Sequence, residues 1–295
     1  MGVKEKLLYA NNWNIGFCEQ TSHDLISGHS LKTIQWMKHP YKDRWFADPF
    51  IYQVTENEIV VFVEECPIEN PKGILCELVL DRKNKRLKQR YVLLELDTHL
   101  SYPAIIREGD KVYVYPENGA SGKLDIYEYD EAHHCLTNPV CILEKAVADA
   151  TIMKKDGRYI LIATHNPETQ KNAYLYESQS LFGPFCQISK DAFQPLISCA
   201  RPGGNWIQIG DDVYRPAQNC EIRYGASLNI MSCKFIGREV SEKKAFAINP
   251  INKRYNLGIH TLNFHQDICV VDGYGYLYPL YFRLYKSLRT IFHVR

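Results

Sequence analysis

Short segments of alternating apolar and polar residues, rich in Tyr, Val, Ile and Phe, recur along most of the chain. Examples are EIVVFVEE (58–65), KVYVYPE (111–117), RYILIATH (158–165) and DICVVDGYG (267–275). Such segments are typical of β-strands that bury one or both faces. Polar segments such as REGDK, KKDGR and FHQD join consecutive strands and predict β-hairpins. Helical patterns are scarce, so the sequence predicts an all-β protein.

The predicted strands repeat in units of about 50 residues, each introduced by a short triplet led by a polar residue. The triplets are Asp48-Pro49-Phe50, Tyr102-Pro103-Ala104, Asp149-Ala150-Thr151, Arg201-Pro202-Gly203 and His260-Thr261-Leu262. Their spacings are 54, 47, 52 and 59 residues. A period of this length with about four strands per unit is typical of a β-propeller. We therefore expect a five-bladed β-propeller with four-stranded antiparallel blades and a short C-terminal helix.

The repeat also predicts the domain organisation. Residues 1–275 should form a single propeller domain, with blades near 43–98, 99–146, 147–198, 199–256 and 257–275. An N-terminal strand should complete the last blade. Residues 276–295 carry four basic side chains and apolar residues at helical spacing, which predicts a basic amphipathic helix. This helix either contacts a membrane peripherally or packs on the propeller, and the sequence leaves both open.

Propeller geometry makes polar residues at equivalent strand ends candidates for a shared site. The inner strands of all blades line one axis, so their polar ends converge at one mouth of the central tunnel. Asp48, Glu117 and Asp149 are the candidate catalytic residues. The candidate substrate-binding residues are Glu65, Tyr102, His165, Arg201, Arg215, Gln218 and His260. Tyr102 and Trp45 are candidates for stacking on a ring of the ligand.

Composition and charge exclude several classes of protein. The chain has 35 Lys and Arg residues and 34 Asp and Glu residues, so its net charge is close to zero. This charge balance gives no support for nucleic-acid binding. The sequence has no apolar run of transmembrane length and no signal-peptide pattern, which predicts a cytoplasmic protein, with the inner membrane face as a second expectation. The ten cysteines lack metal-ligand spacing and are expected to be buried thiols. We expect no cofactor and no metal.

Several motifs carry a resemblance to a known family. WFADPF, HLSYP, YPEN, ADATI, ARPGG, YRPAQNC and GIHTLN resemble the propeller domain of plant glucosamine inositolphosphorylceramide transferases and of bacterial polysaccharide-cluster proteins. The resemblance covers about residues 13–275. That domain is similar to the five-bladed furanosidase-type propellers of arabinanases, β-xylosidases and fructosidases.

The resemblance implies roles for the carboxylates. Asp48 matches the base or nucleophile of the furanosidases, and Asp149 matches the residue that tunes the pKa of the acid. The fourth blade departs from the hydrolase pattern, because Arg201 stands where a general-acid Glu is expected. Glu117 is then the candidate proton donor, since cleavage of a glycosidic bond needs a proton for the leaving oxygen.

The two arginines separate the candidate functions. Guanidinium groups bind phosphate or carboxylate, which a neutral-sugar hydrolase does not need. The sequence therefore favours a glycosyltransferase of cell-surface polysaccharide or glycolipid biosynthesis, with an enzyme acting on an acidic sugar also left open. In the transferase, Arg201 and Arg215 hold the phosphate of an activated sugar donor, a furanose being one candidate sugar, while a glycan acts as acceptor. A furanosidase-like hydrolase and a non-catalytic glycan-binding propeller remain open alternatives.

Overall fold

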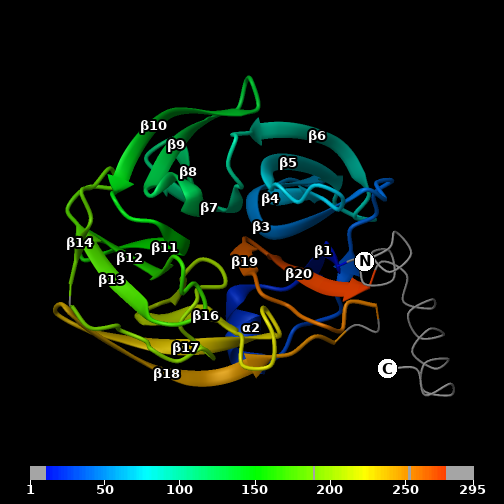
Figure 1. The fold of residues 1–295 in the computed structure, drawn as a ribbon. Coiled ribbons are helices and arrows are strands. Elements are labelled where there is room, and N and C mark those ends of the chain that lie inside the picture. The colour runs from blue at the N-terminus through cyan, green and yellow to red at the C-terminus, as the bar shows by residue number, and fades with distance from the viewer. Residues whose placement is uncertain (1–10, 189, 252–253, 277–295) are drawn as a thin grey trace, which may run out of the picture.

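The computed structural model describes residues 11–188, 190–251 and 254–276, which form five four-stranded antiparallel sheets around a central axis (Figure 1). The predicted five-bladed propeller is confirmed. The predicted C-terminal helix at 276–295 falls almost wholly outside the described residues. Among the described elements, no helix is long and apolar enough to cross a membrane.

The first four blades follow one another along the chain, and in each the first strand is the innermost. The first blade contains β3 (Arg44–Val54), β4 (Glu58–Pro67), β5 (Ile74–Asp81) and β6 (Leu87–Leu94). The second contains β7 (Ser101–Glu108), β8 (Lys111–Glu117), β9 (Leu124–Asp130) and β10 (Cys135–Leu143). The third contains β11 (Val147–Lys155), β12 (Arg158–His165), β13 (Ala173–Ser178) and β14 (Cys186–Gln187). The fourth contains β15 (Ile207–Ile209), β16 (Asp212–Asn219), β17 (Ser227–Ile236) and β18 (Glu239–Ile248).

The fifth blade is built from both ends of the described chain. β19 (Leu262–His265) and β20 (Ile268–Tyr276) pair with β1 (Asn11–Glu19), which in turn pairs with β2 (Gln35–Trp36). The helix α2 (Ser22–Gly28) connects β1 to β2, and a short 3-10 turn, η1 (Gly119–Ser121), follows β8. The β1–β20 ladder extends from Asn11↔Tyr276 to Glu19↔Ile268 and closes the ring.

The blades are held together by apolar side chains on both faces of their strands. β4 shows why: Ile59–Cys66 form one continuous buried run, as expected for a strand covered on both sides. One cluster joins the first three blades through Phe62, Tyr115 and Leu161. Other clusters join the third blade to the fourth, the fourth to the fifth, and the fifth back to the first.

A bulge interrupts the inner strand of each of the first three blades at the residue that the sequence repeat marked. The register shifts fall between Ala47 and Phe50, Ser101 and Ala104, and Ala148 and Thr151. Asp48, Tyr102 and Asp149 sit in these bulges with φ of 50°, 47° and 48°. Residues other than glycine rarely adopt this left-handed backbone conformation. Those that do are often at functional or tightly constrained positions.

Tyr102 links blades at the axis through buried hydrogen bonds, and we call it an axial tie for this reason. It does not stack on a ligand ring, so that expectation from the sequence was wrong. Its side chain is fully buried, and its hydroxyl lies 3.0 Å from Thr151 Oγ1. The same hydroxyl accepts a hydrogen bond of 2.7 Å from the Gly204 N–H of the fourth blade. No Cβ fits at Gly204, since it would lie 1.9 Å from the Leu262 carbonyl oxygen.

We predict that Tyr102→Phe lowers the free energy of unfolding by about 1–3 kcal/mol, because the buried Gly204 N–H loses its acceptor. Urea unfolding of the full chain measures this loss. Tyr91→Phe is the matched control, since the partly buried Tyr91 ring stacks on His134 away from the axis. Equal stability of wild type and Tyr102→Phe would contradict the axial role.

Candidate functional site

A cavity of about 210 Å³ opens at the tunnel mouth where the inner strands begin. This volume is below the ~300 Å³ that drug-sized ligands need, so it has room for roughly one sugar ring. The cavity combines carboxylates, two histidines, an arginine and aromatic rings. Its lining residues are Trp13, Trp45, Ala47, Asp48, Glu64, His99, Ser101, Glu117, Arg201, Tyr224 and His260.

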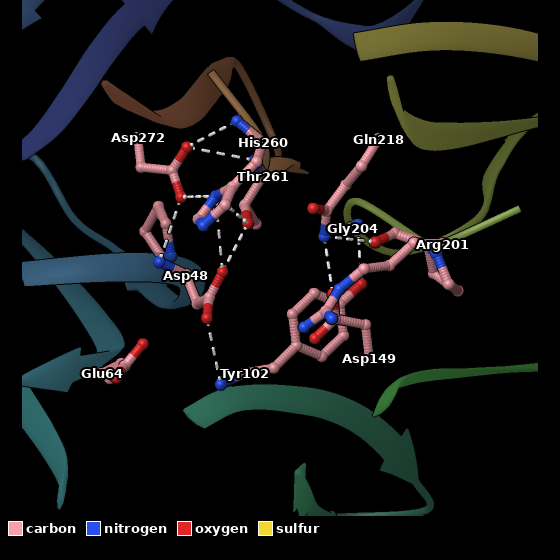
Figure 2. Close-up of polar contacts among 12 residues, drawn as sticks. Asp48, Glu64, Tyr102, Asp149, Arg201, Gly204, Gln218, His260, Thr261 and Asp272 are labelled. Carbon is pink, nitrogen blue, oxygen red and sulfur yellow. Dashed lines mark hydrogen bonds and ion pairs between the residues drawn. The ribbon is translucent and has the colours of Figure 1, made fainter. Parts of the chain in front are cut away.

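Asp48 lies between the first, second and fifth blades (Figure 2). Its Oδ1 accepts a hydrogen bond of 2.7 Å from the Thr261 hydroxyl, and its Oδ2 accepts the Tyr102 N–H at 3.3 Å. The bulge at Asp48 aims the carboxyl group at these donors and at the cavity. Burial raises the pKa of Asp48 to about 7, although the nearby His260 opposes the shift.

His260 and Asp272 form a buried ion pair behind Asp48. His260 Nδ1 lies 2.5 Å from Asp272 Oδ2 and 3.7 Å from Asp48 Oδ1. Asp272 Oδ1 also accepts the backbone N–H groups of His260 and Thr261, at 2.9 and 3.1 Å. Burial disfavours the imidazolium, but the carboxylates of Asp272 and Asp48 outweigh it and raise the pKa of His260 to about 9.

Asp149 anchors the second half of the site. Its Oδ2 accepts hydrogen bonds from Arg201 Nε at 2.5 Å and from Gln218 Nε2 at 2.6 Å (Figure 2). Its backbone N–H donates to Glu117 Oε2 at 3.2 Å. Arg201 Nη2 also reaches Glu117 Oε2, at 3.3 Å. Arg201 therefore holds the carboxylates of the second and third blades together.

Glu117 has the electrostatics of a proton donor. Burial raises its pKa well above the usual value, and the neighbouring Asp149 carboxylate adds to this shift against the opposing pull of Arg201. The raised pKa favours the neutral acid relative to an ordinary glutamate. A carboxyl group with a raised pKa close to a second carboxyl group is typical of sites that make or break glycosidic bonds.

The pocket carboxylate of β4 is Glu64, whereas Glu65 is the residue predicted from the sequence. Adjacent strand residues point to opposite faces, and Glu64 faces the cavity with its Oε1 3.2 Å from His99 Nε2. Glu65 points into the blade and pairs with Arg44 and Arg90. The expectation for Glu65 was therefore wrong in position.

Arg215 is also not at the mouth. Its fully buried guanidinium pairs with Glu242 of β18, with Nη2 and Oε1 2.6 Å apart, and donates to the carbonyl oxygens of Cys199 and Ala200. All of its contacts lie within the fourth blade and its entering segment, so it cannot clamp a donor phosphate. The physical reason is the strand alternation: Gln218, three residues later on β16, reaches Asp149 instead.

Of the remaining predicted residues, some line the cavity and others lie behind it or away from it. Gln218 is fully buried and supports Asp149 from behind, so it touches the catalytic candidate rather than the cavity. His165 is stacked on Tyr174 and hydrogen-bonded to Tyr176, and it is not among the residues that line the cavity. Asp48, Glu117, Arg201, His260 and Trp45 all face the cavity.

The structure adds residues that sequence reasoning did not select. Trp13 and Tyr224 contribute rings, and Trp13 stacks on His260 with centroids 4.0 Å apart. Asp272 orients His260, and its place at the polar end of a second strand was the signal that would have found it. Asp48, His260 and Asp272 also hold potential metal-ligand atoms within 4.8 Å of one another, although the sequence predicted no metal.

The comparisons with solved structures place this protein in the class of five-bladed β-propellers and show that it shares this fold with several glycoside hydrolases. It superposes on a thermostable family-43 glycoside hydrolase with a TM-score of 0.55 at 14% identity, over 72% of this chain and 81% of that one. A family 117 glycoside hydrolase of Zobellia galactanivorans gives 0.57 at 10% identity, over 82% and 88%. The α-L-arabinanase of Cellvibrio cellulosa in complex with arabinohexaose gives 0.54 at 13% identity, over 73% and 84%. At these identities the likeness shows the fold.

Within this class, residues 25–273 match the family described as "Glucosamine inositolphosphorylceramide transferase 1, N-terminal", and the chain belongs to that family. The resemblance stated from the motifs is thereby confirmed. The chain is 24% identical over 217 residues to glucosamine inositolphosphorylceramide transferase 1 of Oryza sativa subsp. japonica, covering 71% of this chain and 28% of that protein. For the Arabidopsis thaliana protein of the same name, identity is 25% over 204 residues, covering 66% and 26%. The chain thus spans about a quarter of the length of these relatives.

We predict that Arg215→Met lowers the free energy of unfolding by about 3–5 kcal/mol, because Glu242 is left as an unpaired buried charge. The double variant Arg215→Met with Glu242→Leu should recover most of this loss. Arg82→Met is the control, since its ion pair with Asp267 is partly exposed and worth about 0–1 kcal/mol. Urea unfolding distinguishes these cases, and a small loss in Arg215→Met would contradict the assigned structural role.

We predict that stability decreases as pH rises from 6.5 to 9. His260 has a pKa of about 9 against 6.5 for an ordinary histidine, so its contribution is complete below 6.5 and disappears as pH passes 9. The pKa of Asp48 is about 7 in the folded protein against 3.8 for an ordinary aspartate. Ionisation of this buried carboxyl group therefore also lowers stability as pH rises between these two values. Urea unfolding at a series of pH values measures the slope. The slope should be shallower in His260→Gln, and an identical slope would refute the assignment.

Proposed function

We propose that the tunnel mouth is the active site of a glycosyltransferase that transfers a sugar from an activated, phosphate-bearing donor to a glycan acceptor. The observation that carries the proposal is the pair Asp48 and Glu117: both face one sugar-sized cavity, and burial raises the pKa of both. Two carboxyl groups with shifted pKa values on one cavity are typical of sites that make or break glycosidic bonds.

In the proposed reaction Asp48 is the general base. It takes the proton of the acceptor hydroxyl while the oxygen of that hydroxyl bonds to the anomeric carbon. The bond from the anomeric carbon to the donor phosphate breaks, and its electron pair leaves with the phosphate oxygen. A pKa of about 7 suits a base that must be ionised at neutral pH and still accept a proton.

The second half of the site stabilises the leaving group. Arg201 carries the positive charge nearest to Glu117, and Glu117 in its neutral form donates a hydrogen bond or a proton to the departing oxygen. Asp149 positions Arg201 through the 2.5 Å contact to Nε. Because Arg215 lies inside the blade, the phosphate clamp proposed from the sequence reduces to Arg201.

The aromatic lining supports a sugar ligand. Trp13, Trp45 and Tyr224 present rings to the cavity, and such rings pack on the apolar faces of pyranoses and furanoses. The name of the relatives contains inositolphosphorylceramide, so a glycolipid is one acceptor that we include. Peripheral membrane contact through residues 276–295 and a cytoplasmic location at the inner membrane face remain parts of the proposal.

Glycoside hydrolysis is the second candidate. Glu117 as acid and Asp48 as base would act in the same way if a water molecule took the place of the glycan acceptor. The position of Arg201 disfavours hydrolysis. In the furanosidase-type hydrolases that the sequence resembles, the general-acid Glu stands at this position of the fourth blade. A neutral sugar gives no role to this charge. A glycan-binding propeller without catalysis is the third reading.

The test is to incubate the full chain with a panel of nucleotide sugars and glycan acceptors and to measure nucleotide release and product formation. Asp48→Asn and Glu117→Gln should each lower the rate by about 10²–10⁴-fold, because both remove a proton-transfer group. Asp267→Asn, an acid substitution on an exposed hairpin tip, should leave the rate within about twofold.

The outcomes separate the three readings. Turnover of aryl furanosides with no turnover of any sugar nucleotide would replace transfer by hydrolysis. Glycan binding without either reaction would leave a binding module. Activity that survives both Asp48→Asn and Glu117→Gln would refute the active site itself.

A further inference from the structure

A second and larger cavity, of about 350 Å³, lies at the opposite end of the propeller axis, where the inner strands end in their hairpins. Residues from all five inner strands or the segments that lead into them line it. We call this cavity the second mouth and define it by Arg107, Lys154, Asn205, Trp206, Gln208 and His265. Its volume falls in the range of about 300–1,000 Å³ that is typical of small-molecule sites.

The blade repeat gathers hydrogen-bond donors at this end. Arg107, Lys154 and Gln208 each occupy the second pair from the hairpin turn, opposite Val112, Tyr159 and Val213. Equivalent positions on neighbouring inner strands lie around one axis, so these three donors surround one space. None of the described residues that line the second mouth is acidic.

Arg107 is the principal cation. Its guanidinium lies over the Tyr52 ring, 5.6 Å from the centroid, and donates to the Tyr52 carbonyl oxygen. Among the ion pairs of the described ranges, none involves Arg107. Burial lowers the pKa of this guanidinium, which is the direction expected of a cation without a neutralising partner.

Two further charged side chains near the second mouth, Lys154 and Asp267, have ion-pair partners. Lys154 Nζ lies 2.7 Å from Glu108 Oε1 in a half-exposed pair. Asp267, two residues from His265 on the β19–β20 turn, is held by Arg82 at 2.6 Å. Burial and the nearby Arg107 lower the pKa of His265. Among the residues that line the second mouth, the charge without an ion-pair partner in the described ranges is therefore positive and centred on Arg107.

The second mouth also contains apolar and polar groups suited to an organic ligand. Trp206 and Phe264 line one side with aromatic rings. The Asn205 side chain donates to the Ile105 carbonyl oxygen, while its buried Oδ1 accepts no hydrogen bond from the described residues. A buried acceptor without a partner is unfavourable unless a ligand or water supplies the donor.

From these features we propose that the second mouth binds a phosphate ester that carries a ring, either a nucleotide or a sugar phosphate. The phosphate contacts Arg107 and Lys154, because guanidinium and ammonium groups are strong partners for phosphate oxygens. The ring lies against Trp206, and a ring hydroxyl or amine donates to Asn205 Oδ1. This site is separate from the first cavity, which contains Asp48 and Glu117 and which we call the carboxylate mouth. It does not depend on the proposed transferase reaction.

The experiment is calorimetric titration of the full chain with uridine 5′-monophosphate, glucose 1-phosphate, inorganic phosphate and uridine. We expect the two esters to bind more tightly than inorganic phosphate, and uridine to give no signal. Arg107→Ala should weaken ester binding by about tenfold or more, and Lys154→Ala by a smaller factor because Glu108 shares its charge. Trp206→Leu should weaken the esters more than inorganic phosphate.

The control substitution is Lys155→Ala. Lys155 neighbours Lys154 on β11 but does not line the cavity, and its ammonium group lies 5.5 Å from the Phe235 ring centroid. It should change the dissociation constant by less than about twofold. Thermal unfolding without ligand checks that each variant is folded, and Arg107→Lys, which keeps the charge, should restore part of the affinity.

Three results would overturn the proposal. One is the absence of ester binding at millimolar concentration. A second is equal weakening by Lys155→Ala and Arg107→Ala, which would indicate non-specific attraction. A third is binding that survives Arg107→Ala but disappears in Arg201→Gln, which would place the ester in the carboxylate mouth. A preference for the nucleotide or for the sugar phosphate identifies which ring the site accepts.

Discussion

The pairing of β1 with β20 closes the propeller ring and holds the five blades in place. It joins segments about 250 residues apart, and closing a loop of that length costs about 5 kcal/mol in chain entropy. The ladder from Asn11↔Tyr276 to Glu19↔Ile268 and the apolar cluster between the fifth and first blades offset this cost. Closure also brings His260, Thr261 and Asp272 of the fifth blade to Asp48 of the first. Without it the acid–base network at the mouth does not exist.

The bulges explain how ordinary strands present reactive groups. At Asp48 and Asp149 the backbone takes a left-handed conformation, and this re-aims a carboxylate from the strand face toward the axis. Dense packing holds the strained conformation, and the same packing removes water from the carboxyl groups. The resulting desolvation is the largest cause of the raised pKa of Asp48 and Glu117. Fold, strain and acid–base chemistry therefore have one origin.

The two mouths of the axis have opposite chemistry on one scaffold. The first gathers Asp48, Glu64 and Glu117 around Arg201 and His260, whereas the lining described for the second contains cations and no acid. Several glycoside hydrolases share the fold, but fold alone does not decide the reaction. Arg201, ion-paired to Asp149 and Glu117, is the residue on which the proposal of transfer rather than hydrolysis depends.

The strands, the repeat near 50 residues, the five blades and the triplets that become bulges could all be predicted from the sequence, because they depend on local alternation and turn chemistry. The sequence also selected Asp48, Glu117, Asp149 and Arg201, since their positions recur with the blades. Only the tertiary structure decided between Glu64 and Glu65, moved Arg215 into a pair with Glu242 and turned Tyr102 into an axial tie. The physical reason is that a one-residue change of strand face, or a partner on another strand, redirects a side chain without altering the sequence pattern that identifies its strand.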